Sequence, residues 1–164
     1  MQYPIPRHLL PFLQPEKELC SETQAVGAVR CKCGGLLFTP YVNDAGTIAA
    51  ARCGSCGGKI MLFHAGKHGW DAFVAKAADL YELPTQMHGV DTCPECGKKT
   101  RFALKLDIAS AGKEEFVRLS GLEDEDGQPL KPEDWTEAFD VFRMDIVCPE
   151  CCKTTESVID IETS

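Results

Sequence analysis

Eight of the ten cysteines stand in closely spaced pairs, and these pairs are the residues with the clearest chemistry. A C-x₂-C pair brings two thiolates to neighbouring corners of a tetrahedron, and a second pair from another loop completes a closed four-thiolate metal site. The spacing therefore predicts two structural zinc ions. One is expected on Cys31, Cys33, Cys53 and Cys56, and the other on Cys93, Cys96, Cys148 and Cys151.

Several alternatives to this assignment stay open. Only one residue separates Cys31 from Cys33, which departs from the usual spacing. Alternate pairs sharing a metal, as in cross-brace domains, would give different ligand sets, and iron also binds four-cysteine sites. Cys20 and Cys152 are unassigned, and each is a candidate to replace a predicted ligand. Disulfides would fit a secreted chain, and redox C-x-x-C motifs would need a strand–helix context that the sequence does not suggest.

A second group of residues with chemical potential lies in the stretch HAGKHGWD. His64 and His68, with Asp71, are the candidate acid–base residues of an enzyme. Gly66 and Gly69 favour a loop here rather than a shared helical face. Hydrolytic zinc chemistry needs an open coordination position, and four cysteines close a site. We therefore predict a protein without catalytic residues, and keep an enzyme as the weaker alternative.

Charged residues suggest two possible kinds of partner. The stretch 109–138 is rich in acidic residues, including Glu123 to Asp126, and favours docking of a basic protein. Near the third cysteine pair, by contrast, basic residues could contact phosphates, with Phe102 among them as a stacking candidate. These basic residues are Lys98, Lys99, Arg101 and Lys105.

The elements that must position these residues are mainly strands. Alternating apolar residues and turn signals predict strands over 36–42, 47–52 and 59–63, with a hairpin turn at 43–46. The same pattern predicts strands over 102–108 and 142–146 and a last strand through Ile159 and Ile161, which together form a three-stranded antiparallel sheet. Helical spacing of Phe73, Ala77 and Leu80 predicts a helix over 70–83, and a short helix is expected from Pro132, anchored by Trp135.

The motifs CKCGG, CGSCGG, CPECG and CPECC resemble those of zinc-ribbon proteins. The resemblance covers about two-thirds of the chain and identifies a fold group rather than a family. It implies a mainly β, metal-stabilised fold of two ribbon modules linked by one helix. The expected organisation is a proline-rich extended arm (1–28), a first ribbon (29–68), a helical linker (69–90), and a second ribbon (91–164) carrying the acidic insertion 109–138.

Composition limits the classes of protein that remain. The chain of 164 residues has 44% hydrophobic and 26% charged residues, as expected for a globular protein. Its formal net charge is -8, and residues 91–164 hold eighteen acidic against nine basic residues, which disfavours general attraction to nucleic acid or membranes. No apolar run is long enough to cross a bilayer, and the start lacks a secretory signal pattern, so a cytoplasmic location is expected.

Together these observations predict a zinc-binding, non-catalytic module for protein–protein recognition, of an inhibitor, immunity or adaptor type. The expected partner is another protein, with the acidic insertion and the apolar N-terminal arm as contact surfaces. A nucleic-acid-associated zinc ribbon is the alternative. The sequence does not fix the oligomeric state.

Overall fold

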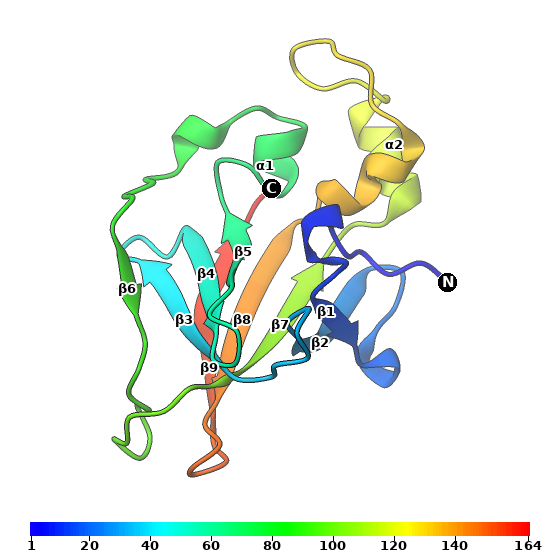
Figure 1. The fold of residues 1–164 in the computed structure, drawn as a ribbon. Helices are drawn as coiled ribbons and strands as arrows, with labels where there is room; N and C mark the ends of the chain where they lie inside the picture. The colour runs from blue at the N-terminus through cyan, green and yellow to red at the C-terminus, as the bar shows by residue number, and fades with distance from the viewer.

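The computed structural model describes residues 1–164, apart from the side chain of Ala78. The described residues form two antiparallel sheets, which confirms the mainly β fold (Figure 1). One sheet has the strand order β1-β2-β7-β8-β9 and the other the order β5-β4-β3-β6. The first contains β1 (Leu13–Pro15), β2 (Gln24–Val29), β7 (Ala103–Ala109), β8 (Val141–Val147) and β9 (Thr154–Glu162). The second contains β3 (Phe38–Asn43), β4 (Ile48–Cys53), β5 (Lys59–His64) and β6 (Met87–Gly89).

The predicted hairpins are present in both sheets. Strands β3, β4 and β5 occupy the predicted strand positions of the first module, and β7, β8 and β9 those of the second. The turn between β3 and β4 is fixed by Asn43, whose side-chain oxygen accepts hydrogen bonds from the N–H groups of Thr47 and Ile48. Gly46 completes this turn with a φ of 68°, a conformation that glycine adopts without steric cost.

The N-terminal segment differs from the extended arm that the prolines predict. It contains the 3₁₀ turns η1 (Arg7–Leu9) and η2 (Lys17–Leu19), and its strands β1 and β2 join the five-stranded sheet beside β7. Leu9 and Leu13 are buried in the core. Because these apolar side chains are covered by the chain itself, they do not form the open contact surface expected for the arm.

The helix predicted over 70–83 is wrong in length. The structure has only α1 (Trp70–Phe73) and a separate 3₁₀ turn, η3 (Ala78–Leu80). Lys76 adopts a φ of 55°, and the carbonyl of Val74 accepts a hydrogen bond from the N–H of Glu125 rather than from its own helix. The carbonyl of Val74 is thus bonded to the acidic insertion and does not accept the hydrogen bond that a longer helix would need.

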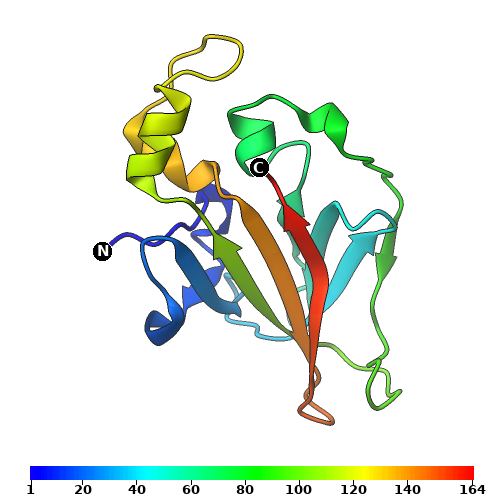
Figure 2. The ribbon, with the colours of Figure 1, turned by 180° about the vertical axis from the view of Figure 1, so that it is seen from behind.

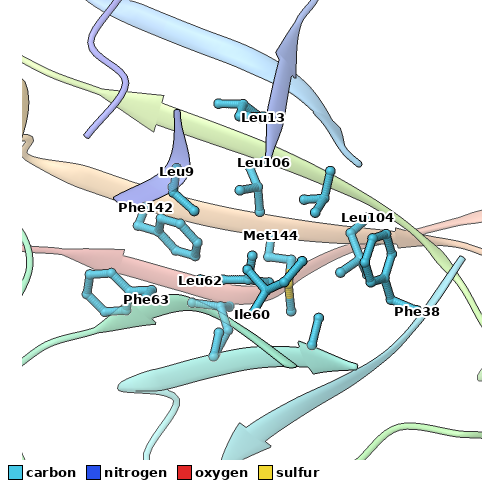
Figure 3. Close-up of a cluster of buried hydrophobic side chains, with 14 of the residues drawn as sticks. Leu9, Leu13, Phe38, Ile60, Leu62, Phe63, Leu104, Leu106, Phe142 and Met144 are labelled. Atoms are coloured by element: carbon cyan, nitrogen blue, oxygen red, sulfur yellow. The ribbon is translucent and has the colours of Figure 1, made fainter. Parts of the chain in front are cut away.

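The sheets pack face to face over one hydrophobic cluster, which extends through both predicted ribbon modules (Figure 3). Leu104, Leu106 and Met144 from the five-stranded sheet face Ile60 and Leu62 from the other. The rings of Phe63 and Phe142 stack at 4.8 Å between the sheets. Burial of these apolar side chains between the two sheets is the main stabilising contribution to a fold of this kind.

The acidic insertion forms a smaller unit at one end of the sheets. It contains α2 (Lys113–Ser120) and the 3₁₀ helix η4 (Pro132–Glu137), which has Pro132 in its first turn as expected. Phe116 and the predicted anchor Trp135 are buried in a separate small cluster. The loop between α2 and η4 projects beyond the sheets (Figures 1 and 2). Among the described residues, no helix is both long and apolar enough to span a membrane.

Candidate metal centres

The first cysteine cluster lies where three chain segments meet. Cys31 and Cys33 follow β2, Cys53 ends β4, and Cys56 lies in the turn before β5. The four sulfur atoms lie within 4.8 Å of one another, with Sγ–Sγ distances of 3.6 Å for Cys31–Cys56 and for Cys33–Cys53. Tetrahedral zinc with bonds of about 2.3 Å requires sulfurs about 3.8 Å apart. The cluster therefore has the dimensions of a four-thiolate metal site.

Backbone N–H groups surround these sulfurs. Gly35 donates to Sγ of Cys33, Ser55 to Sγ of Cys53 and Gly58 to Sγ of Cys56, each at 3.4 Å. A Cβ on Gly35 would lie 2.6 Å from the Cys53 sulfur, so the close approach requires glycine at this position. Such N–H contacts stabilise thiolates, which are the form that binds metal.

The second cluster joins the turn before β7 to the turn between β8 and β9. The Sγ–Sγ distances are 3.8 Å for Cys93–Cys151 and for Cys96–Cys148, and all four sulfurs lie within 4.8 Å of one another. The N–H of Glu95 donates to Sγ of Cys93 at 3.4 Å. The structure thus groups adjacent cysteine pairs, as the sequence predicts, rather than the alternate pairs of a cross-brace.

The backbone around the sulfurs favours ionisation of one thiol in each cluster. The N–H of Cys56 lowers the pKa of Cys53 to about 6, and the N–H of Cys96 lowers the pKa of Cys93 to about 7. The N–H of Gly35 likewise acts to lower the pKa of Cys33, but the neighbouring thiols of Cys53 and Cys31 raise it to about 12. Four thiolates at this spacing repel one another, and a divalent cation between them would offset that repulsion.

The two clusters lie at the same end of the molecule and are directly connected. The N–H groups of Phe38 and Phe102 each donate to the other residue's carbonyl at 2.8 Å, which bridges the two sheets. The N–H of Gly54, in the first cluster's turn, donates to the carbonyl of Leu37. Arg101, beside the second cluster, packs over Gly54. The cysteine-containing ends of both modules are therefore held in one arrangement.

The two remaining cysteines lie outside both clusters. The sulfur of Cys20 lies 3.3 Å from both the N–H and the carbonyl of Val26, across a turn. Cys152 is exposed, and its N–H donates to the carbonyl of Cys148 at 2.8 Å. Neither sulfur belongs to a group of close-lying metal ligands among the described residues.

The histidine candidates do not meet Asp71 as an acid–base group would. The Asp71 carboxylate instead accepts a hydrogen bond from the hydroxyl of Tyr81 at 2.6 Å. Nδ1 of His68 accepts a hydrogen bond from the N–H of His64, and the His68 ring stacks on His8 at 3.8 Å. Burial is the main cause that lowers the pKa of His68, to about 3. The partnership of His8 and His68 joins residues far apart in the chain, so no local pattern indicated it.

The four basic candidates are divided between turn and strand. Lys98, Lys99 and Arg101 are exposed beside the second cluster, whereas Lys105 lies on β7 and pairs with Glu16 at 3.7 Å. Phe102 is completely buried, so its ring does not present a surface for stacking on a base.

Comparisons with protein-family models, curated proteins and solved structures give no match to this chain. The functional assignment therefore rests on the geometry of its own residues.

Proposed function

We propose that each four-cysteine cluster binds one zinc ion in a structural role. The observation that carries this proposal is the close grouping of four sulfurs in each cluster, with spacings near those of a zinc tetrahedron. Four thiolates leave no coordination position for water or substrate, so the zinc would hold turns together rather than catalyse a reaction.

Elemental analysis of the purified protein tests this proposal directly. We expect two zinc ions per chain, with release of metal by a strong chelator accompanied by loss of structure in far-UV circular dichroism. One ion per chain, or none, would contradict the proposal. Bound iron would give a coloured protein and would replace zinc as the assigned metal.

We further infer that the protein recognises a basic protein partner through its acidic turn, defined here as residues 122–130. Asp124 is buried and fixes this turn from within, because its carboxylate accepts hydrogen bonds from the N–H groups of Asp126 and Gln128. The turn is also attached to the preceding segment. Asp124 pairs with Lys76 at 3.5 Å, and the N–H of Glu125 donates to the carbonyl of Val74 at 3.0 Å.

The remaining acidic side chains of the turn face solvent. Glu123, Glu125 and Asp126 are exposed and take part in none of the ion pairs found among the described residues. A charged surface on a fixed backbone loses little conformational entropy when it binds. Opposite charge on a partner would both accelerate association and select the orientation of docking.

Nucleic acid is a less suitable partner for this molecule. Phe102 offers no stacking surface, and Lys105 already has an acidic neighbour. Each zinc-loaded four-thiolate site would also add net negative charge beside Lys98 and Lys99. The exposed acidic turn repels phosphate, so a basic protein is favoured.

The test compares two variants with the same change in net charge. Glu123→Lys, Glu125→Lys and Asp126→Lys together reverse the exposed charge of the acidic turn and leave the buried Asp124 intact. Glu18→Lys, Glu22→Lys and Glu156→Lys change three exposed residues outside the acidic turn and outside both cysteine clusters. A partner that co-purifies with the unaltered protein is identified by mass spectrometry, purified, and titrated against all three proteins.

We expect the acidic-turn variant to weaken binding by at least about tenfold, while the control variant stays within about threefold. Both variants should retain two metals and an unchanged circular dichroism spectrum. Equal weakening by both variants would leave only a general charge effect and would refute the proposed contact surface. Salt-sensitive binding of an oligonucleotide that depends on Lys98 and Lys99 would favour the nucleic-acid role instead.

A further inference from the structure

The first ribbon module, residues 29–68, differs in charge from the rest of the chain. It contains five basic residues and one acidic residue, whereas the remainder contains twelve basic and twenty-four acidic residues. The acidic residue is Asp44, and its carboxylate lies 2.8 Å from Nε2 of His88. A zinc-loaded four-thiolate site would add about two negative charges and still leave the module positive. The module is therefore a basic region on an otherwise acidic protein.

Two of these basic residues lie directly opposite each other on neighbouring strands. Arg52 on β4 is the antiparallel partner of Lys59 on β5, and both side chains are exposed. Opposite residues have Cβ atoms about 5 Å apart, and like charges in such a position are destabilising. Neither residue of this basic pair takes part in any ion pair found among the described residues. The uncompensated pair favours a negatively charged group supplied from outside the chain.

The five-stranded sheet gives an internal comparison, because its exposed charges are compensated. Lys105 on β7 lies opposite Asp145 on β8. Arg143 on β8 lies between Asp107 on β7 and Asp160 on β9, and it bonds to Asp160 at 3.0 Å. Charged neighbours on that sheet thus have opposite sign, whereas the strands β3, β4 and β5 contain no acidic residue. The basic pair is a particular feature of the four-stranded sheet.

Apolar side chains lie beside the basic pair. Met61 follows Lys59 by two residues on β5, so both lie on the same face of the sheet, and 43% of Met61 is exposed. Tyr41 on β3 is half-buried and lies in the same row as Met61 across the sheet. This face points away from the other sheet, because the alternate residues Ala51 and Ile60 are buried in the core. A ligand bound here would contact both positive charge and apolar surface.

A groove between the two modules extends this surface. Thr39 lies opposite Arg52 and also lines the groove, which encloses about 550 Å³. Leu37 lines it as well and is 39% exposed. The charged residues of its lining are Lys99, Arg101, Asp91 and Glu150. Because these four charges balance, the uncompensated positive charge is concentrated at the basic pair, and the groove adds room and an apolar wall beside it.

We propose that this surface binds an acidic segment of a second protein, in which carboxylates and apolar side chains are interspersed. The carboxylates pair with Arg52 and Lys59, and a guanidinium can hold a carboxylate through two hydrogen bonds. The apolar side chains contact Met61 and Leu37. Nucleic acid fits the surface less well, because its phosphates would leave these two apolar side chains without partners. The proposal does not rest on a partner at the acidic turn, which lies away from this sheet (Figure 1).

Fluorescence anisotropy with synthetic peptides tests the proposal on the metal-loaded full chain. The probe is a labelled peptide of repeated Glu-Glu-Leu units. A peptide of repeated Gln-Gln-Leu units is the matched control, because it keeps the apolar side chains and lacks the carboxylates. We expect saturable binding of the acidic peptide with a Kd below about 1 mM at low salt, and no saturable binding of the neutral peptide.

Two double variants show whether binding uses the basic pair. Arg52→Gln with Lys59→Gln should weaken binding of the acidic peptide at least about tenfold. Lys17→Gln with Lys113→Gln removes the same charge at exposed positions on other elements and should change binding by less than about twofold. Metal content and circular dichroism should stay the same in both, because the first variant removes a repulsion and the second changes only exposed side chains.

A third variant tests the apolar contact and does not alter charge. Met61→Gln should weaken binding of the Glu-Glu-Leu peptide about threefold and leave binding of a peptide made only of Glu unchanged. If the variant of the basic pair fails to fold, this comparison of the two peptides still decides whether the surface is used.

Four results would overturn the proposal. The first is no saturable binding of the acidic peptide, and the second is equal weakening by both double variants. The third is tighter binding of a single-stranded oligonucleotide through Arg52 and Lys59, which would make nucleic acid the ligand of this surface. The fourth is self-association at low salt in analytical ultracentrifugation that the variant of the basic pair abolishes, because the occupant would then be a second copy of this chain.

Discussion

Cys152 occupies a backbone conformation that glycine normally adopts, and replacing it tests the ligand assignment of the second cluster. Its φ is 59°, close to the 73° of Gly57 and of Gly97. Its N–H donates to the carbonyl of Cys148 just as that of Gly97 donates to Cys93, so the two turns have the same hydrogen-bond pattern. The sulfur of Cys152 is exposed and lies 3.9 Å from the carbonyl of Pro149, too far for a strong contact.

The expected effect of Cys152→Gly follows from two opposing contributions. A left-handed backbone costs a residue with a Cβ about 1–2 kcal/mol, and glycine removes this cost. Glycine also makes the unfolded chain more flexible, which lowers the free energy of unfolding by about 0.5–1 kcal/mol. The difference predicts stabilisation of about 0.5–1 kcal/mol. Cys152→Ser retains the Cβ and should leave stability within about 0.5 kcal/mol of the unaltered protein.

Guanidinium unfolding at a fixed free zinc concentration measures this change, because bound metal contributes to apparent stability. Elemental analysis of the same samples should give equal metal content for the original protein and both variants. Loss of about one metal per chain in both Cys152→Gly and Cys152→Ser would identify Cys152 as a ligand. Destabilisation by glycine with both metals retained would instead refute the conformational reasoning.

Three further predictions address the clusters, the core and the histidines. Cys96→Ser should reduce the metal content by one ion per chain in elemental analysis, whereas Cys20→Ser should leave it unchanged because Cys20 lies outside both clusters. Gly27→Ala should lower the free energy of unfolding by about 3 kcal/mol in denaturant titrations, since its Cβ would overlap the Gln14 backbone; Gly46→Ala, with open space around it, should cost only about 1 kcal/mol. Because the pKa of His68 is lowered from 6.5 to about 3, the unfolded chain binds more protons below pH 6.5 and stability falls as pH decreases. His68→Asn, whose side-chain oxygen can replace Nδ1 as the acceptor, should recover up to about 2 kcal/mol of that loss at pH 5, and an unchanged pH profile would count against the role of His68.

The sequence predicted those parts of the fold that rest on local patterns. Alternation of Phe102, Leu104, Leu106 and Ile108 with polar residues indicated β7 correctly, because one face of that strand packs on the core. The turn at 43–46 was equally predictable, because Asn and Gly stabilise it within four residues. Cysteine spacing indicated which sulfurs gather, since each pair lies in one short turn.

The parts that the sequence did not predict depend on contacts between distant segments. Strand β2 contains Gly27 and small residues without alternation, and it forms because β1 and β7 flank it on both sides. The helical spacing of Phe73, Ala77 and Leu80 was not sufficient to form the long helix. The N–H of Glu125 donates a hydrogen bond to the carbonyl of Val74, which a continuing helix would need. The stacking of His8 on His68 likewise required the folded N-terminal segment. Tertiary contacts override local propensity at each of these positions.

The two ends of the molecule are stabilised by different means. At the cysteine end, the turns contain glycines and exposed residues such as Leu36 and Leu37. A metal ion bound by the clustered sulfurs would fix these turns. At the other end, Phe116 and Trp135 form a separate small core, and the buried Asp124 shapes the acidic turn without any metal ligand. The proposed zinc sites would therefore stabilise the cysteine end, whereas the shape of the acidic turn, the proposed recognition surface, would not depend directly on the metal. That separation explains why the residues with the clearest chemistry in the sequence are not those that we assign to recognition.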